Sequence, residues 1–281
     1  MEYWKALVRW IVAPGWRGNL VALFAGAVTP LFLAPYGIWP LAVLSTGLLY
    51  LGLKQASPLQ AFLRGWCYGF GVFLFGTGWV YVSIHVYGHA PVFLAAFLTA
   101  AFSAGVALVF ALMTWVWGRW LRRSGSSVQD ALAFAGLWVL QEFFRGWFLT
   151  GFPWLYAGYS QLSGPLAGLA PVGGVWLVSF VVVLTGALLC NLARSRENRR
   201  GFVVLLVLLL LPWFAGLLLK NHAWTRAAGE SLQVVLVTAY IDKTMTWEAG
   251  QCNAHLGRDR SKTSAAGTCA NVVWRKTSLR I

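Results

Sequence analysis

Residues 65–118 read GWCYGFGVFLFGTGWVYVSIHVYGHAPVFLAAFLTAAFSAGVALVFALMTWVWG and contain no aspartate, glutamate, lysine or arginine. A helix that crosses a bilayer needs about 20 predominantly apolar residues. This stretch is long enough for two such helices, and Gly88 and Pro91 interrupt it near its middle. The stretch therefore predicts two membrane-spanning helices joined by a short turn.

The rest of the amino-terminal part has the same character. Of the 281 residues, 59% are hydrophobic and 11% are charged, whereas soluble domains hold roughly 25% charged residues. Further apolar runs predict two spans within 18–53 and one each within 127–148, 173–192 and 201–219. We therefore predict an all-α polytopic membrane domain of about seven transmembrane helices over residues 1–220.

The basic residues gather in the loops on one side of this arrangement. Twelve lysines and arginines fall there: Lys5, Arg9, Arg17, Lys54, Arg64, Arg119, Arg122, Arg123, Arg194, Arg196, Arg199 and Arg200. Cytoplasmic loops of membrane proteins are enriched in Lys and Arg, so we predict a cytoplasmic N-terminus and a tail after residue 220 on the outer face. No basic stripe suited to nucleic acid is present. The net charge of +14 therefore indicates topology, and no nucleic-acid partner is expected.

The composition changes in residues 221–281. Eight of the 22 basic and four of the eight acidic residues lie in this segment. The β-branched runs 231–237 and 271–274 predict two strands. Two strands cannot bury a core of their own, so we predict an incomplete α/β segment.

Glu142 and Arg145 are the main candidates for function within the predicted spans. Ionisable groups in lipid cost roughly 2.5–3.5 kcal/mol each on insertion scales, and the i,i+3 spacing places both on one helix face. One interpretation is a local ion pair that lowers its own insertion cost. The other is a polar rim that contacts lipid headgroups on the outer side. The irregular aromatic segment 150–161 follows them.

Other residues are weaker candidates for a functional site. His85 and His89 could be ligands or a proton relay, but two histidines without a carboxylate partner are more often interfacial. The four cysteines show no CxxC or zinc spacing. The sequence contains no GxSxG, HExxH or Gly-rich phosphate loop. We therefore predict no metal and no cofactor.

Spaced motifs give the sequence a specific resemblance. The residues from 138 to 161 that carry it are Trp138, Glu142, Arg145, Gly146, Thr150, Gly151, Phe152, Pro153, Trp154, Gly158, Tyr159 and Gln161. Together with 78–85 they resemble the signature of the bacterial apolipoprotein N-acyltransferases. Residues 233–237 resemble the first strand of that family's nitrilase-like domain, and 245–248 resemble its Lys-Trp-acidic element. The resemblance covers most of residues 1–250.

The resemblance implies an enzyme of the bacterial inner membrane whose nitrilase-like domain is periplasmic. It would move an acyl chain from a phospholipid to the N-terminal amine of a diacylglyceryl-cysteine lipoprotein. The family uses a glutamate base, a lysine and a cysteine that forms a thioester, which is covalent catalysis. By the resemblance, Trp247 lies at the site entrance. The implied outer-side substrate-binding residues are Glu142, Arg145, Phe152, Pro153, Trp154 and Tyr159.

The tail departs from the family pattern. Lys276 stands where the family has the general-base glutamate, and a lysine that is cationic at neutral pH has no lone pair to accept a proton. The family lysine and cysteine would lie beyond Ile281. We therefore expect a truncated and inactive family member, with a frameshift after about residue 250 as the working hypothesis. The alternatives are a non-catalytic membrane scaffold and a small-molecule transporter, although the paired interrupted helices of transporters are not found in the sequence.

Overall fold

The computed structural model describes residues 12, 15–122, 127–192, 199–225, 236–237 and 274–275. The chain divides into two compact units, Met1–His222 and Ala223–Ile281. Predictions on Lys5, Arg9, Arg123, Trp247 and Lys276 lie outside the described residues, as do those on Arg194, Arg196, Cys252 and Cys269.

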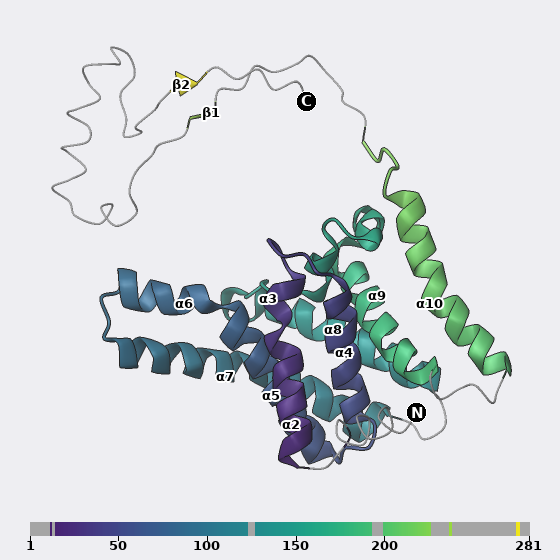
Figure 1. Ribbon diagram of the computed structural model, residues 1–281, viewed down its shortest axis with the longest axis horizontal. Helices are drawn as coiled ribbons and strands as arrows, with labels where there is room; N and C mark the ends of the chain where they lie inside the picture. Colours follow the sequence, from purple (N-terminus) through teal and green to yellow (C-terminus); the bar gives the residue numbers. More distant parts are fainter. Residues whose placement is uncertain are drawn as a thin grey trace. The chain divides into compact units, whose positions relative to one another are not determined.

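The described part of the first unit consists of α-helices with short 3₁₀ and π-helical turns, labelled η (Figure 1). In chain order they are α2 (Trp16–Ala27), α3 (Thr29–Phe32), α4 (Pro40–Leu53), α5 (Pro58–Gly76), α6 (Gly78–Val82), η1 (Ser83–Tyr87), α7 (Val92–Val116), η2 (Trp117–Leu121), α8 (Ser127–Trp147), η3 (Phe148–Thr150), η4 (Ala157–Gln161), η5 (Pro165–Leu169), α9 (Ala170–Leu192) and α10 (Arg199–Leu219). The predicted helical membrane domain is confirmed.

The predicted number of spans is not confirmed. Within the described ranges, three helical stretches are long and apolar enough to cross a membrane: Val92–Leu121, Pro165–Leu192 and Gly201–Leu219. A fourth span results if Pro58–Gly76 and Gly78–Tyr87, bent by 56° at their junction, are counted together. The other helices fall short because α2 and α4 have 12 and 14 residues, and because α8 carries Asp130, Glu142 and Arg145.

Close backbone contact holds α2 against α5. A Cβ atom added at Gly26 would lie 2.0 Å from the main-chain oxygen of Tyr68. A Cβ atom added at Gly71 would lie 2.2 Å from the main-chain oxygen of Leu23. Small residues that let helix backbones approach are the usual basis of helix packing in membranes. Only glycine fits at these two positions.

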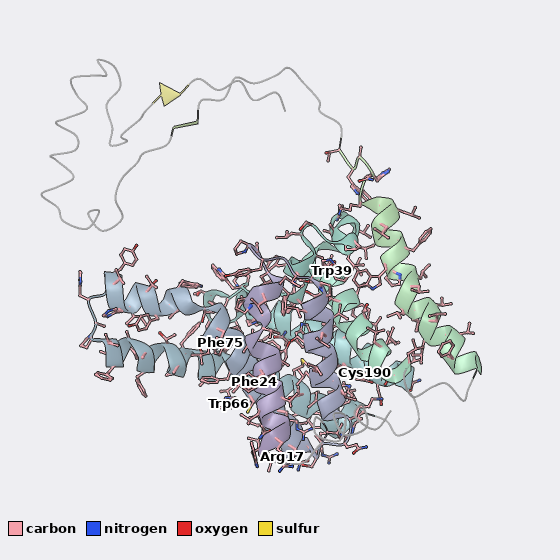
Figure 2. The ribbon with its side chains drawn as sticks, in the orientation of Figure 1. Arg17, Phe24, Trp39, Trp66, Phe75 and Cys190 are labelled. Carbon is pink, nitrogen blue, oxygen red and sulfur yellow. The ribbon has the colours of Figure 1, made fainter. Side chains whose placement is uncertain are left out.

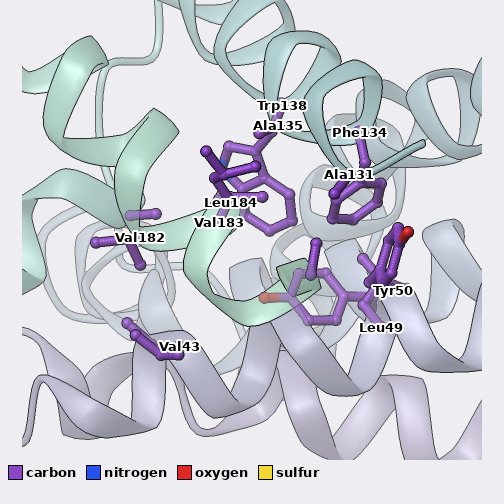
Figure 3. Close-up of a cluster of buried hydrophobic side chains, with 14 of the residues drawn as sticks. Val43, Leu49, Tyr50, Ala131, Phe134, Ala135, Trp138, Val182, Val183 and Leu184 are labelled. Carbon is purple, nitrogen blue, oxygen red and sulfur yellow. The ribbon is translucent and has the colours of Figure 1, made fainter. Parts of the chain in front are cut away.

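One cluster of buried side chains in the core lies where α4, α8 and α9 meet (Figure 3). Tyr50 of α4 packs its ring 5.2 Å from that of Phe134 of α8, measured between centroids. Phe134 is in turn 6.1 Å from Trp138, and Val182 and Val183 of α9 complete the cluster. Such offset aromatic pairs add to the stabilisation that burial provides.

At one end of the unit, the ends of three helices meet. Arg122, after η2, donates from Nη1 to the main-chain oxygens of Leu53 and Ala56, at 2.8 Å each. Lys54, after α4, donates to Oδ1 of Asn191 in α9 at 2.5 Å. Arg17 of α2 lies at this end, and Trp39, before α4, lies at the other (Figure 2).

At the opposite end, the carboxyl terminus of α10 reaches the segment before α9. Lys220 donates from Nζ to the main-chain oxygen of Ser163 at 2.9 Å. The rings of Trp39 and Trp213 are 5.1 Å apart. The segments that contain Trp39, Ser163 and Lys220, all predicted from the sequence to lie on the outer side, are thus found together at this end of the unit.

The second unit is described at residues 223–225 and at two short strands. β1 (Leu236–Val237) pairs antiparallel with β2 (Trp274–Arg275). These strands overlap or adjoin the two predicted ones. The α/β nitrilase-like segment itself falls mainly outside the described residues and stays a prediction.

Candidate functional site

Glu142 anchors the segment that follows α8. Its side chain is only 1% exposed. One carboxylate oxygen, Oε1, accepts from the indole N–H of Trp138 at 2.9 Å and from the main-chain N–H of Ala157 at 2.8 Å. Because Ala157 begins η4, this carboxylate fixes the start of η4 to the end of α8.

Arg145 holds the same segment one helical turn further along. Its Nη1 donates to the main-chain oxygen of Trp154 at 2.5 Å and to that of Phe152 at 3.4 Å. The guanidinium carbon lies 5.2 Å from the ring centroid of Phe73 and 5.0 Å from that of Tyr156. Burial raises the pKa of the Tyr156 phenol, so this ring stays neutral beside the cation. Both distances are within the range of cation–π contacts.

Glu142 and Arg145 attract each other electrostatically, but the predicted ion pair is not a direct one. Within residues 127–192 the two side chains form no salt bridge with each other. They share a helix face as predicted, but each side chain binds main-chain atoms that lie seven to fifteen residues further along the chain. Both are buried, so neither forms an exposed polar rim.

The segment 148–156 has an unusual backbone. Leu149, Thr150 and Leu155 have φ values of +50°, +74° and +62°, a region that non-glycine residues rarely adopt. Gly151 has φ +88°, and a Cβ atom there would lie 2.2 Å from the main-chain oxygen of Gly146. Such conformations persist only where surrounding contacts impose them, and Glu142 and Arg145 supply those contacts.

Phe152 is the centre of an aromatic cluster that joins distant parts of the sequence. Its ring centroid lies 5.2 Å from that of Trp154, 5.3 Å from that of Phe102 and 6.5 Å from that of Trp79. Trp79 and Trp154 are themselves 5.9 Å apart. We call Trp79, Phe152 and Trp154 the aromatic platform. Trp79 and Trp154 are 48% and 49% exposed, so the platform presents an accessible apolar surface.

The other predicted residues take varied positions. Pro153 and Tyr159 are exposed, and Phe152 is half-buried. His85 points its Nδ1 at the main-chain oxygen of Ala90, 2.8 Å away, which closes the turn before α7. Among the described residues, no group of three or more His, Cys, Asp or Glu side chains is arranged to hold a metal.

Sequence reasoning missed three contributors to the site. Ser179 of α9 accepts the main-chain N–H of Gly158 through its hydroxyl at 2.8 Å. Phe73 and Phe102 line the guanidinium and the platform. Serine and phenylalanine within apolar runs give no signal of such a role. Trp79 lies in the motif 78–85, which was the available signal.

This geometry defines the class of molecule. It is a multi-pass helical membrane protein in which two buried polar side chains hold an aromatic segment at one end of the helices. The N-terminal domain of apolipoprotein N-acyltransferases matches residues 25–188 of the sequence. The chain belongs to the apolipoprotein N-acyltransferase family.

Relatives named apolipoprotein N-acyltransferase match nearly the whole chain. The protein from Pseudomonas syringae pv. tomato is 54% identical over 274 residues, which are 98% of this chain and 54% of the relative. The protein from Pseudomonas aeruginosa (strain UCBPP-PA14) is 56% identical with the same coverage. The protein from Coxiella burnetii is 34% identical over 263 residues, 94% of this chain and 54% of the relative. The chain thus spans about half the length of the curated relatives it matches, and the match continues past residue 250.

Proposed function

We propose that the chain provides the membrane part of an enzyme that transfers an acyl chain from a phospholipid to the N-terminal amine of diacylglyceryl-cysteine lipoproteins. The observation that carries the proposal is 54–56% identity over 98% of the chain to apolipoprotein N-acyltransferases. The proposed acyl transfer proceeds through a thioester, so that one difficult transfer becomes two easier ones. The proposed donor and acceptor are both lipids, which helices in the bilayer can present to a catalytic domain.

The aromatic platform and its neighbours are the proposed substrate contacts. Trp154, Pro153 and Tyr159 are exposed, and indole rings favour the headgroup region of a bilayer. We propose that these side chains and Phe152 contact the acyl donor. Glu142 and Arg145 are buried, and they would act on substrate through the segment they hold. Trp247 stays a proposed residue of the site entrance.

We further propose seven spans in the bacterial inner membrane, with the N-terminus cytoplasmic. Contacts of Arg122 and Lys54 join helix ends at the basic end of the unit. Lys220 joins the segment before α9 at the other end. This separation supports the alternation that the basic loops predict. The shorter helices α2 and α4 would then span with their flanking turns, and residues after 220 would be periplasmic.

An acyl-transfer assay on two fusion proteins tests the function. The joined chain is the full chain followed by the part of the Pseudomonas aeruginosa relative that lies beyond the match. The exchanged chain is residues 1–225 followed by the corresponding remainder of that relative. Each is reconstituted with a phospholipid carrying a labelled acyl chain and with a diacylated lipopeptide, and the product is measured by mass.

We expect the exchanged chain to form triacylated lipopeptide. Inactivity of a correctly inserted exchanged chain would contradict the proposal and favour the scaffold. Uptake of small solutes into the same vesicles would favour a transporter.

The joined chain tests Lys276 by itself. Because a lysine there cannot accept a proton, we expect transfer by the joined chain only with Lys276→Glu. Equal activity with either residue would show that position 276 does not hold the general base.

A further inference from the structure

We propose that Glu142 and Arg145 are positioning residues that act separately: Glu142 as a hydrogen-bond acceptor whose charge is dispensable, and Arg145 as a planar donor that lysine cannot replace. They hold segment 148–161 so that Phe152 and Trp154 meet Trp79. For activity, this inference rests on the proposed function. Its structural part can be tested without any substrate.

The contacts of Glu142 show what its carboxylate does. The Trp138 indole and the Ala157 amide donate to the same oxygen, Oε1, and the Ser179 hydroxyl also interacts with the carboxylate. All three groups are neutral. The other oxygen, Oε2, is buried and has no hydrogen-bond partner among the described residues. Glutamine offers a carbonyl oxygen at the same distance from the backbone. An uncharged side chain can therefore make both contacts.

The contacts of Arg145 require its shape. One nitrogen, Nη1, reaches the main-chain oxygens of Trp154 and Phe152, while the flat guanidinium makes cation–π contacts with the rings of Phe73 and Tyr156. Its Nε and Nη2 have no hydrogen-bond partner within the described ranges. Lysine keeps the charge but not the planar, stacking donor group. A role in attracting an anion would survive that change, whereas this fit would not.

The segment needs such support. Three of its non-glycine residues, Leu149, Thr150 and Leu155, have left-handed backbone angles, which cost free energy unless tertiary contacts impose them. The anchors are the Glu142 acceptor, the Arg145 donor and the Ser179 hydroxyl, which accepts the Gly158 N–H. The two platform residues of the segment, Phe152 and Trp154, lie in the chain between the end of α8 and the Ala157 and Gly158 amides that Glu142 and Ser179 bind. Loss of one anchor should free the platform while the helices stay folded.

Hydrogen exchange of the full chain in lipid nanodiscs tests the acceptor role. In Glu142→Leu the Ala157 amide loses its acceptor, so peptides covering 149–161 should exchange about tenfold faster or more. In Glu142→Gln they should exchange as in the unmodified chain. Peptides from α2 and α5 serve as internal controls and should not change in either variant. Equally fast exchange in Glu142→Gln and Glu142→Leu would overturn the acceptor role and show that the charge is needed.

The matched pair Arg145→Lys and Arg145→Leu tests the planar donor. Both variants should exchange faster across 149–161, by about tenfold, because lysine lacks the planar group that contacts the rings of Phe73 and Tyr156 and leucine lacks the donor as well. Exchange at the unmodified rate in Arg145→Lys would overturn this part of the inference.

The same variants, made in the exchanged chain, test whether the placement of segment 148–161 affects acyl transfer. Glu142→Gln should rescue most of the transfer that Glu142→Leu loses, and Arg145→Lys should lose about tenfold or more, as expected for misplaced binding groups. Full transfer by Glu142→Leu and Arg145→Lys, despite faster exchange, would refute a role in the reaction. If the unmodified exchanged chain is inactive, the proposed function fails, while the exchange data still decide whether the two residues hold the segment.

Discussion

The interface between α2 and α5 and the segment 148–161 are held in place by opposite means. The interface depends on missing side chains, because backbone atoms occupy the space that a Cβ at Gly26 or Gly71 would need. The segment depends on side chains that are present, because Glu142 and Arg145 bind its main-chain atoms. In both regions the residues that hold the structure together are buried: Gly26 and Gly71 in the first, Glu142 and Arg145 in the second.

The difference separates folding from positioning. A helix interface built on backbone contact is distributed over many atoms, and any added atom must displace a whole helix. A segment held by a few hydrogen bonds can be released by one substitution while the rest of the unit keeps its packing. We therefore expect substitutions in the first region to abolish the fold and substitutions in the second to change its function.

The largest effect is expected at the helix interface. Gly26→Leu places a side chain against the main-chain oxygen of Tyr68, which cannot rotate away. Overpacking of a tight core costs about 1–3 kcal/mol and sometimes more, so little monodisperse protein should be recovered in detergent. Gly136→Ala is the control, because nothing lies within 4 Å of a Cβ atom there. Normal recovery of Gly26→Leu would show that α2 is not packed as described.

An intermediate effect is expected where η4 meets α9. A Cβ atom at Gly158 would lie 2.4 Å from the main-chain oxygen of Val175, so Gly158→Ala should displace η4 and the platform with it. Acyl transfer by the exchanged chain should fall about tenfold or more, while the melting temperature drops by only a few degrees.

The matched control for this experiment is Gly105→Ala in α7, where a Cβ atom meets nothing within 4 Å. Unchanged transfer by Gly158→Ala would mean that the placement of η4 does not matter for the reaction. If Gly158→Ala lost as much stability as Gly26→Leu, the two regions would not differ in the way that we propose.

The smallest effect is expected at Leu149. This residue is 81% exposed and has φ +50°, so its side chain contributes little packing while its backbone is strained. Asparagine tolerates this conformation better, and Leu149→Asn should stabilise the unit by about 0.5 kcal/mol. Thermal unfolding followed by tryptophan fluorescence would register a rise of one to a few degrees. A lower melting temperature would indicate that the Leu149 side chain is held by contacts that its exposure does not reveal.

Hydropathy was enough to predict the helices, because uncharged runs such as 92–116 and 201–219 have few other stable structures. It was not enough to count the spans, because α2 and α4 are only 12 and 14 residues long. Apolar composition alone does not show where a short helix ends within a run. The charged residues within α8 also make it too polar to be counted as a span from its composition.

The candidate site was predicted in its residues but not in its contacts. The cost of ionisable groups in lipid singled out Glu142 and Arg145, and their spacing suggested that they pair with each other. Their actual partners are main-chain atoms of a segment with left-handed residues. The path of such a segment depends on tertiary contacts, which sequence spacing does not encode. The same holds for the contact between Trp79 and Trp154.

Labelling of single cysteines by a membrane-impermeant maleimide will show whether segment 148–161 and the basic loops lie on opposite faces of the membrane. Leu162→Cys and Ser57→Cys are suitable sites because both positions are exposed, and the four natural cysteines would be replaced by serine. In right-side-out vesicles we expect labelling at position 162 and protection at position 57, with the reverse in inside-out vesicles. Labelling of both positions from the same side would contradict this expectation.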